Sequence, residues 1–95
     1  MPRTPARPPV TVERLQTGVR MEKRMLKVLK ALADYLDLTL GDLLEGIVLH
    51  AFEGKAPFQP ATREKIEELK RVFGLDLTSA DAHNLRAVDD ERGAS

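Results

Sequence analysis

Apolar and polar side chains alternate over residues 15–21, at the two-residue period of a β-strand. One face of this segment carries Leu15, Thr17, Val19 and Met21, and the other carries Gln16, Gly18 and Arg20. The first face can be buried, and the second is free to contact a ligand. No second strand pattern follows in the chain, and unpaired strand edges are a liability. We therefore expect the strand to pair with its copy in a second subunit.

After this segment the apolar positions change to helical spacing. The apolar positions of the first predicted helix, over residues 22–36, are Met25, Val28, Leu29, Leu32 and Leu36. A second helix is predicted from Leu40 to Phe52, with the hydroxyl of Thr39 as its N-terminal cap. Apolar residues surround most of this second helix, so it must be buried on most sides. One strand and one helix cannot provide that burial, which again indicates a dimer.

The C-terminal part predicts further helices. Pro57 and Pro60 end the second helical region and mark a linker at residues 55–60. A third helix over residues 61–73 ends before Gly74, and a short fourth one is expected from residue 79 to about residue 88. This extension, residues 61–88, has a modest apolar set that we expect to pack on the rest of the chain: Ile66, Leu69, Val72, Phe73, Leu75 and Leu77. Residues 1–10 are expected to form a disordered basic arm, residues 11–54 the main domain and residues 89–95 a frayed tail.

The order strand, helix, short turn and buried helix over residues 14–54 resembles the ribbon-helix-helix repressors of the Arc, MetJ and CopG type. The resemblance implies a mostly α fold in which two chains intertwine and their short strands form an antiparallel ribbon across a two-fold axis, here with one or two extra C-terminal helices. It also implies that the ribbon enters the DNA major groove, where outward residues contact base edges. By resemblance these residues are Gln16, Gly18 and Arg20, and a DNA phosphate is held by Thr39, Leu40 and Gly41 at the start of the second helix.

Elementary chemistry agrees with these roles. A guanidinium is best matched to guanine and an amide to adenine, and backbone amides at a helix start suit a phosphate. Two positions depart from the family pattern. Gly18 has no reading side chain, so it either lets the backbone approach the groove closely or marks a bulge. Glu22 places an acid near the expected phosphates.

The zero net charge conceals a strong asymmetry. Residues 1–30 carry eight basic residues, namely Arg3, Arg7, Arg14, Arg20, Lys23, Arg24, Lys27 and Lys30. They carry only two acids, Glu13 and Glu22, which gives +6, and residues 31–95 carry −6. A basic region beside the reading segment is typical of nucleic-acid binding. Arg14 and Arg24 are therefore expected to contact phosphates, whereas Lys27 and Lys30 are more simply explained as a solvated helix face.

Several kinds of chemistry find no support in the sequence. The chain has no cysteine and only two histidines, His50 and His83, which lie on different segments without metal-ligand spacing. It has no nucleophile–histidine–acid arrangement and no glycine-rich phosphate loop. We therefore expect no enzymatic activity, no cofactor and no metal. The lack of cysteine, of a signal segment and of a long apolar run predicts a cytoplasmic protein without membrane association.

The sequence thus predicts a dimeric, sequence-specific DNA-binding transcriptional regulator. The main alternative is an antitoxin-type interaction protein whose C-terminal helices bind a protein partner. Another alternative is a dimerisation scaffold that does not bind DNA, and the +6 charge of residues 1–30 argues against it.

Overall fold

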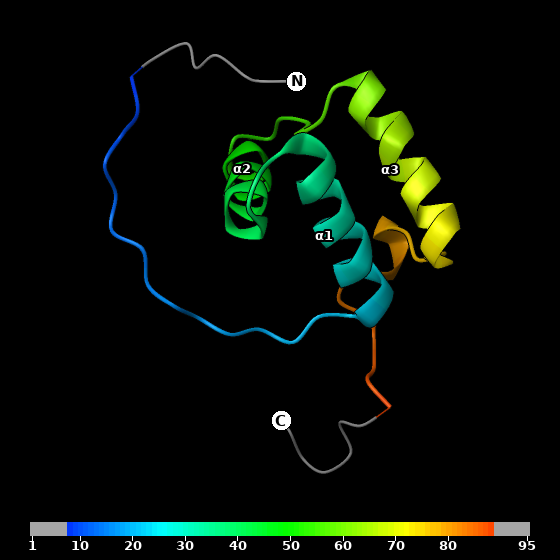
Figure 1. Cartoon of the computed structure of the whole chain (residues 1–95). Helices are drawn as coiled ribbons and strands as arrows, with labels where there is room; N and C mark the ends of the chain where they lie inside the picture. The colour runs from blue at the N-terminus through cyan, green and yellow to red at the C-terminus, as the bar shows by residue number, and fades with distance from the viewer. Residues whose placement is uncertain (1–7, 89–95) are drawn as a thin grey trace.

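The computed structural model describes residues 8–88, and over this range the chain forms three α-helices and one 3₁₀ turn (Figure 1). The elements are α1 (Lys23–Leu36), α2 (Leu40–Phe52), α3 (Pro60–Phe73) and η1 (Ser79–Asp81). The bounds of α2 are those predicted, and α1 and α3 each differ from prediction by a single residue at their first position. Most of the predicted arm and the predicted tail at residues 89–95 lie outside the described residues.

The predicted strand is wrong. Residues 15–21 are coil, and no sheet occurs anywhere in residues 8–88, which contradicts the ribbon-helix-helix fold class and its strand across a dimer axis. Alternation defines two faces, but a strand also needs a neighbour for its backbone N–H and C=O groups. No other segment of the described chain supplies that neighbour. The supposed buried face is open to solvent, with Leu15 90% and Val19 76% exposed.

The helix ends follow the capping chemistry of the sequence. The Glu22 carboxylate accepts a hydrogen bond from the backbone N–H of Met25 at 2.8 Å, which starts α1. The Thr39 hydroxyl accepts one from the N–H of Asp42 at 3.0 Å, which confirms the predicted cap of α2. At the end of α3, Gly74 has the left-handed conformation that favours glycine (φ 69°), as the sequence predicts.

The turn between α1 and α2 is made by a non-glycine residue. Asp37 has φ 63°, and the N–H of Leu38 donates to the carbonyl of Ala33 at 2.8 Å. These features end α1 sharply and let α2 begin after only three intervening residues. The two helices can therefore share one core.

That core lies where the three helices meet. Leu32 on α1 is only 1% exposed, and Ala33 and Leu43 are buried beside it. Apolar side chains from all three helices and from the loops pack around them, namely Leu29, Leu36, Leu38, Ile47, Phe58, Ile66 and Leu69. The expected packing of the third helix is confirmed for Ile66 and Leu69, but Val72 is 67% exposed.

The C-terminal extension has less helix than predicted. After α3, only Ser79–Asp81 is helical, as a 3₁₀ turn, and residues 82–88 are irregular. The side chains of Thr78 and Asp81 each accept a hydrogen bond from the backbone N–H of the other residue, which forms a reciprocal capping box. This motif is complete within a single turn, so it does not make the helix longer. The described residues contain no helix with both the length and the apolar character needed to cross a membrane.

Candidate nucleic-acid interface

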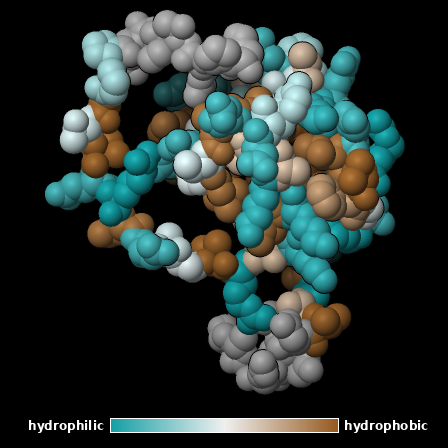
Figure 2. Space-filling view, in the orientation of Figure 1, coloured by the Kyte–Doolittle hydropathy of each residue, from teal (hydrophilic) through white to brown (hydrophobic). Residues whose placement is uncertain are grey.

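The backbone before α1 runs extended as a wide arc, blue to cyan in Figure 1, and the side chain of Arg14 connects this arc to the start of α2. Residues 8–20 are all exposed, and only Met21 and Glu22 at the start of α1 are half-buried. Figure 2 shows apolar and polar residues alternating along this arc, with open space between it and the body. Gln16, Gly18 and Arg20 are therefore accessible, as expected, but so are Leu15, Thr17 and Val19 of the opposite face.

Gly18 has free space around its backbone. A Cβ added there would meet nothing within 4 Å, and its φ is not in the left-handed region. The bulge interpretation does not apply, because a bulge needs a sheet and residues 8–88 contain none. The other interpretation is that a ligand approaches the backbone closely at Gly18, and no neighbouring atom blocks that approach.

Arg14 contacts acids at the start of α2. Its guanidinium donates to both carboxylate oxygens of Glu45, at 2.7 and 2.8 Å, and to Asp42 at 3.3 Å. The hydrogen bond from Arg14 lowers the pKa of Glu45 below its usual range. The charge of Arg14 is thus already matched within the chain, which differs from its predicted role as a phosphate contact. Both side chains of this pair are about half exposed or more, so the pair contributes little to stability.

The predicted phosphate site at the start of α2 has an acidic neighbourhood. The Thr39 hydroxyl is used as the helix cap, and Leu40 and Gly41 follow in the first turn. Asp42 and Glu45 lie beside them on the same exposed side, next to Arg14. A phosphate there would meet two carboxylates, which opposes the attraction of the helix dipole. We therefore do not include Thr39, Leu40 and Gly41 in the proposed DNA surface.

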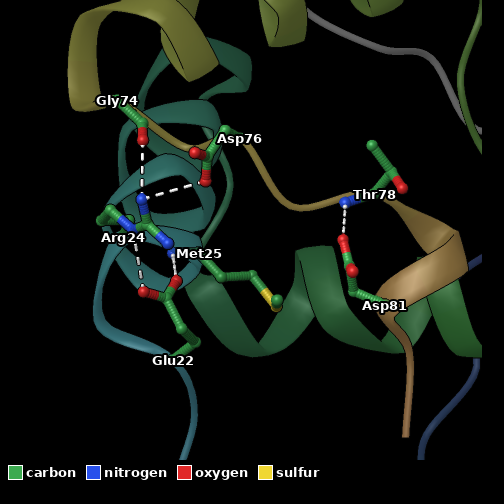
Figure 3. Close-up of polar contacts among 7 residues, drawn as sticks. All are labelled: Glu22, Arg24, Met25, Gly74, Asp76, Thr78 and Asp81. Atoms are coloured by element: carbon green, nitrogen blue, oxygen red, sulfur yellow. Dashed lines mark hydrogen bonds and ion pairs between the residues drawn. The ribbon is translucent and has the colours of Figure 1, made fainter. Parts of the chain in front are cut away.

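Arg24 is held by three groups, as Figure 3 shows. Its Nε donates to Glu22 at 2.9 Å, and its Nη1 donates to the carbonyl of Gly74 at 2.9 Å and to Asp76 at 3.1 Å. The hydrogen bond with Glu22 raises the pKa of Arg24. Arg24 therefore links the start of α1 to the end of α3. This structural role was not predicted from the sequence, and the predicted phosphate contact of Arg24 stays a prediction.

Glu22 gives a pH-dependent prediction. The N–H of Met25, and then the side chain of Arg24, lower the pKa of Glu22 below its ordinary value of about 4.3. A lowered carboxyl pKa contributes stability that is present above the ordinary value and is lost as the pH falls through the folded value. Glu22→Gln should lower the free energy of unfolding at pH 7 by about 0.3–1 kcal/mol, and this difference should shrink towards zero at pH 3. Urea unfolding at both pH values measures it.

The exposed Glu13, outside the helices, provides the control for this prediction. Glu13→Gln removes the same charge and should change the unfolding free energy by less than about 0.5 kcal/mol. A difference between wild type and Glu22→Gln that is equal at pH 3 and pH 7 would contradict the assigned role of the Glu22 carboxylate.

Three lysines lie on one exposed face of α1, and for two of them, Lys27 and Lys30, the sequence favours a solvated helix face. Lys23, Lys27 and Lys30 are spaced at i, i+4 and i+7, and each is exposed. Within residues 8–88, none of their side chains has an ion pair or a hydrogen bond. The i, i+4, i+7 spacing shows from the sequence alone that the three lysines share one helix face. It does not distinguish a binding face from a solvated one. We call these three residues the lysine face.

A second exposed surface is apolar and lies on α2. Val48 is 43%, Leu49 62% and Phe52 81% exposed, although these residues belong to the most apolar helix of the chain. His50 on the same helix is also exposed, and its Nδ1 lies 2.7 Å from the carbonyl oxygen of Gly46. Among residues 8–88, only one side of α2 is covered, through Leu43 and Ile47. We call Val48, Leu49 and Phe52 the α2 apolar face.

In the part of the chain that the structure describes, no three histidine, aspartate or glutamate side chains come together as a metal site would require. No protein-family model, curated protein or solved structure matches the chain.

Proposed function

We propose that this chain is a dimeric, sequence-specific DNA-binding transcriptional regulator. The observation that carries the proposal is the exposed extended segment at residues 8–20, which bears Gln16 and Arg20 and leads directly into the lysine face of α1. Residues 8–30 hold six basic residues against two acids. Extended arms next to helices follow DNA grooves in other DNA-binding domains, and such arms carry arginines. The proposal does not require a sheet.

Base reading is assigned to Gln16 and Arg20. Both lie on the exposed segment, and their amide and guanidinium groups can make paired hydrogen bonds to adenine and guanine. Gly18 between them allows the backbone to come close to the bases or sugars. Sequence preference would then come from residues 16–20, and affinity mainly from nearby lysines.

The dimer is supported by the α2 apolar face. Large apolar side chains that are mostly exposed on one helix side mark an interaction surface. A second copy of the chain is the simplest partner, because it offers the same apolar surface across a two-fold axis. Two copies would also present two basic regions to a duplex. A cytoplasmic location is part of this proposal.

The antitoxin-type alternative has weaker support. Capture of a partner by a free C-terminal segment needs apolar residues that are not already packed. Ile66 and Leu69 of α3 contact the core formed by α1 and α2, so α3 is docked on its own chain. The acidic C-terminal part is then better explained as a cover for α1.

Replacing Arg20 tests the base-reading assignment. A duplex that the wild-type chain prefers is first selected from a random pool. Arg20→Ala should reduce the preference for this selected duplex over a scrambled one by about 1–3 kcal/mol for each arginine–guanine pair that is removed. The fold should remain, because Arg20 lies in an exposed segment outside the helices. Fluorescence anisotropy with both duplexes measures the preference, and circular dichroism verifies the fold.

Arg14→Ala is the matched control, because it removes the same kind of side chain from the same exposed segment, outside residues 16–20. It should change the preference far less than Arg20→Ala does. If the Arg20→Ala variant kept the wild-type preference for the selected duplex, Arg20 would not belong to the base-reading site.

A further inference from the structure

The charged residues at the two ends of α1 are arranged opposite to what the helix dipole favours. Its first turn contains Lys23 and Arg24 and no acid, and its last turn contains Asp34 and no base. The partial charge of a helix is positive at its N-terminus and negative at its C-terminus, so the opposite arrangement is the more stable one. Glu22 and Asp76 compensate Arg24, but no acid among the described residues compensates Lys23. A local arrangement that disfavours stability often marks a functional site.

The lysine face also has the geometry of a continuous contact surface. At 100° per residue, positions i, i+4 and i+7 fall within an arc of about 60° along roughly 10 Å of helix axis. All three side chains are exposed and lack ion pairs within residues 8–88. The next residue on this face is Asp34, whose opposite charge ends the basic surface. The positive charge is thus concentrated at the end of α1 that joins the extended segment.

From these observations we infer that the lysine face binds the phosphate backbone of duplex DNA beside the groove occupied by residues 16–20. The inference rests on the proposed function and identifies where its affinity arises. Lysine ammonium groups act as point charges on phosphates and carry no sequence information. The lysine face would fix the position of the protein on the duplex, while Gln16 and Arg20 select the sequence.

The test compares two triple variants of the full chain that lose the same charge. The first is Lys23→Gln with Lys27→Gln and Lys30→Gln, which removes the lysine face at little cost in helix propensity. The second is Lys55→Gln with Arg63→Gln and Arg71→Gln, which removes exposed basic residues elsewhere. Binding to a labelled duplex is measured from 50 to 200 mM salt. The slope of log K against log salt becomes smaller by about 0.9 for each phosphate that the protein no longer neutralises.

The first variant should bind at least about tenfold more weakly at 50 mM salt and have a salt slope smaller by about two or more, for duplexes of any sequence. The second variant should stay close to wild type in slope. Equal slopes for the two variants would overturn the inference. If the wild-type chain bound no duplex, the proposed function itself would fail. Lysine-dependent binding to vesicles of anionic phospholipid, without duplex binding, would assign the lysine face to a membrane surface and also overturn the inference.

Discussion

Replacing Leu49 and Phe52 together by glutamate is expected to convert the proposed dimer into a folded monomer. Both side chains are largely exposed in the single chain, at 62% and 81%, so the helices should form without them. In the proposed dimer, built on the α2 apolar face, each glutamate would be an uncompensated charge in an apolar contact. Such a charge costs about 3–5 kcal/mol, so the dimer should weaken by roughly three powers of ten or more. Sedimentation velocity at several protein concentrations measures the change.

Val72→Glu is the control for this experiment. Val72 is an exposed apolar residue of similar character, 67% exposed, but it lies on α3 outside the α2 apolar face. The variant should remain dimeric. A wild-type chain that is monomeric at high concentration, or a double glutamate variant that dimerises as wild type does, would contradict the assignment of this face.

Truncation of Leu32 is expected to cause the largest loss of stability of any single change in the core. Leu32 is 1% exposed and lies in the cluster with Ala33 and Leu43, against which α3 also packs. Leu32→Ala removes buried methyl groups and leaves a cavity where the three helices meet. Such changes cost about 2–5 kcal/mol, a large part of the stability of so small a domain. Urea unfolding followed by circular dichroism gives the value.

Leu85→Ala makes the same chemical change at a half-exposed position after η1, 49% exposed. Its cost should stay well below that of Leu32→Ala. If the two variants lost similar stability, the core would not lie between the three helices.

The helices could be predicted from the sequence because local chemistry determines them. Apolar residues at helical spacing define α1, and Thr39 and Gly74 mark where helices begin and end through contacts with their own neighbours. The strand could not be predicted in the same way. The alternation from Leu15 to Met21 describes which side chains share a face, but pairing depends on a second segment, and the described chain has none.

The surroundings of the candidate site were harder to predict, because its arginines contact residues far away in the sequence. Arg14 contacts Glu45, which lies 31 positions away, and Arg24 contacts Asp76, which lies 52 positions away. The sequence predicted phosphate contacts for both arginines because it does not show which distant acids lie beside them. The spacing of the lysine face can be read from the sequence. Its lack of ion-pair partners within residues 8–88 is known only from the structure, which shows where the surrounding acids lie.

The binding of DNA by the basic N-terminal third is tested most directly by selecting bound duplexes from a random pool with the wild-type chain. The affinity of the selected duplex is then measured at 50 and 200 mM salt. DNA binding through this region predicts an enriched sequence and an affinity that falls steeply with salt. Recovery of no enriched sequence, together with an affinity that does not depend on salt, would contradict it.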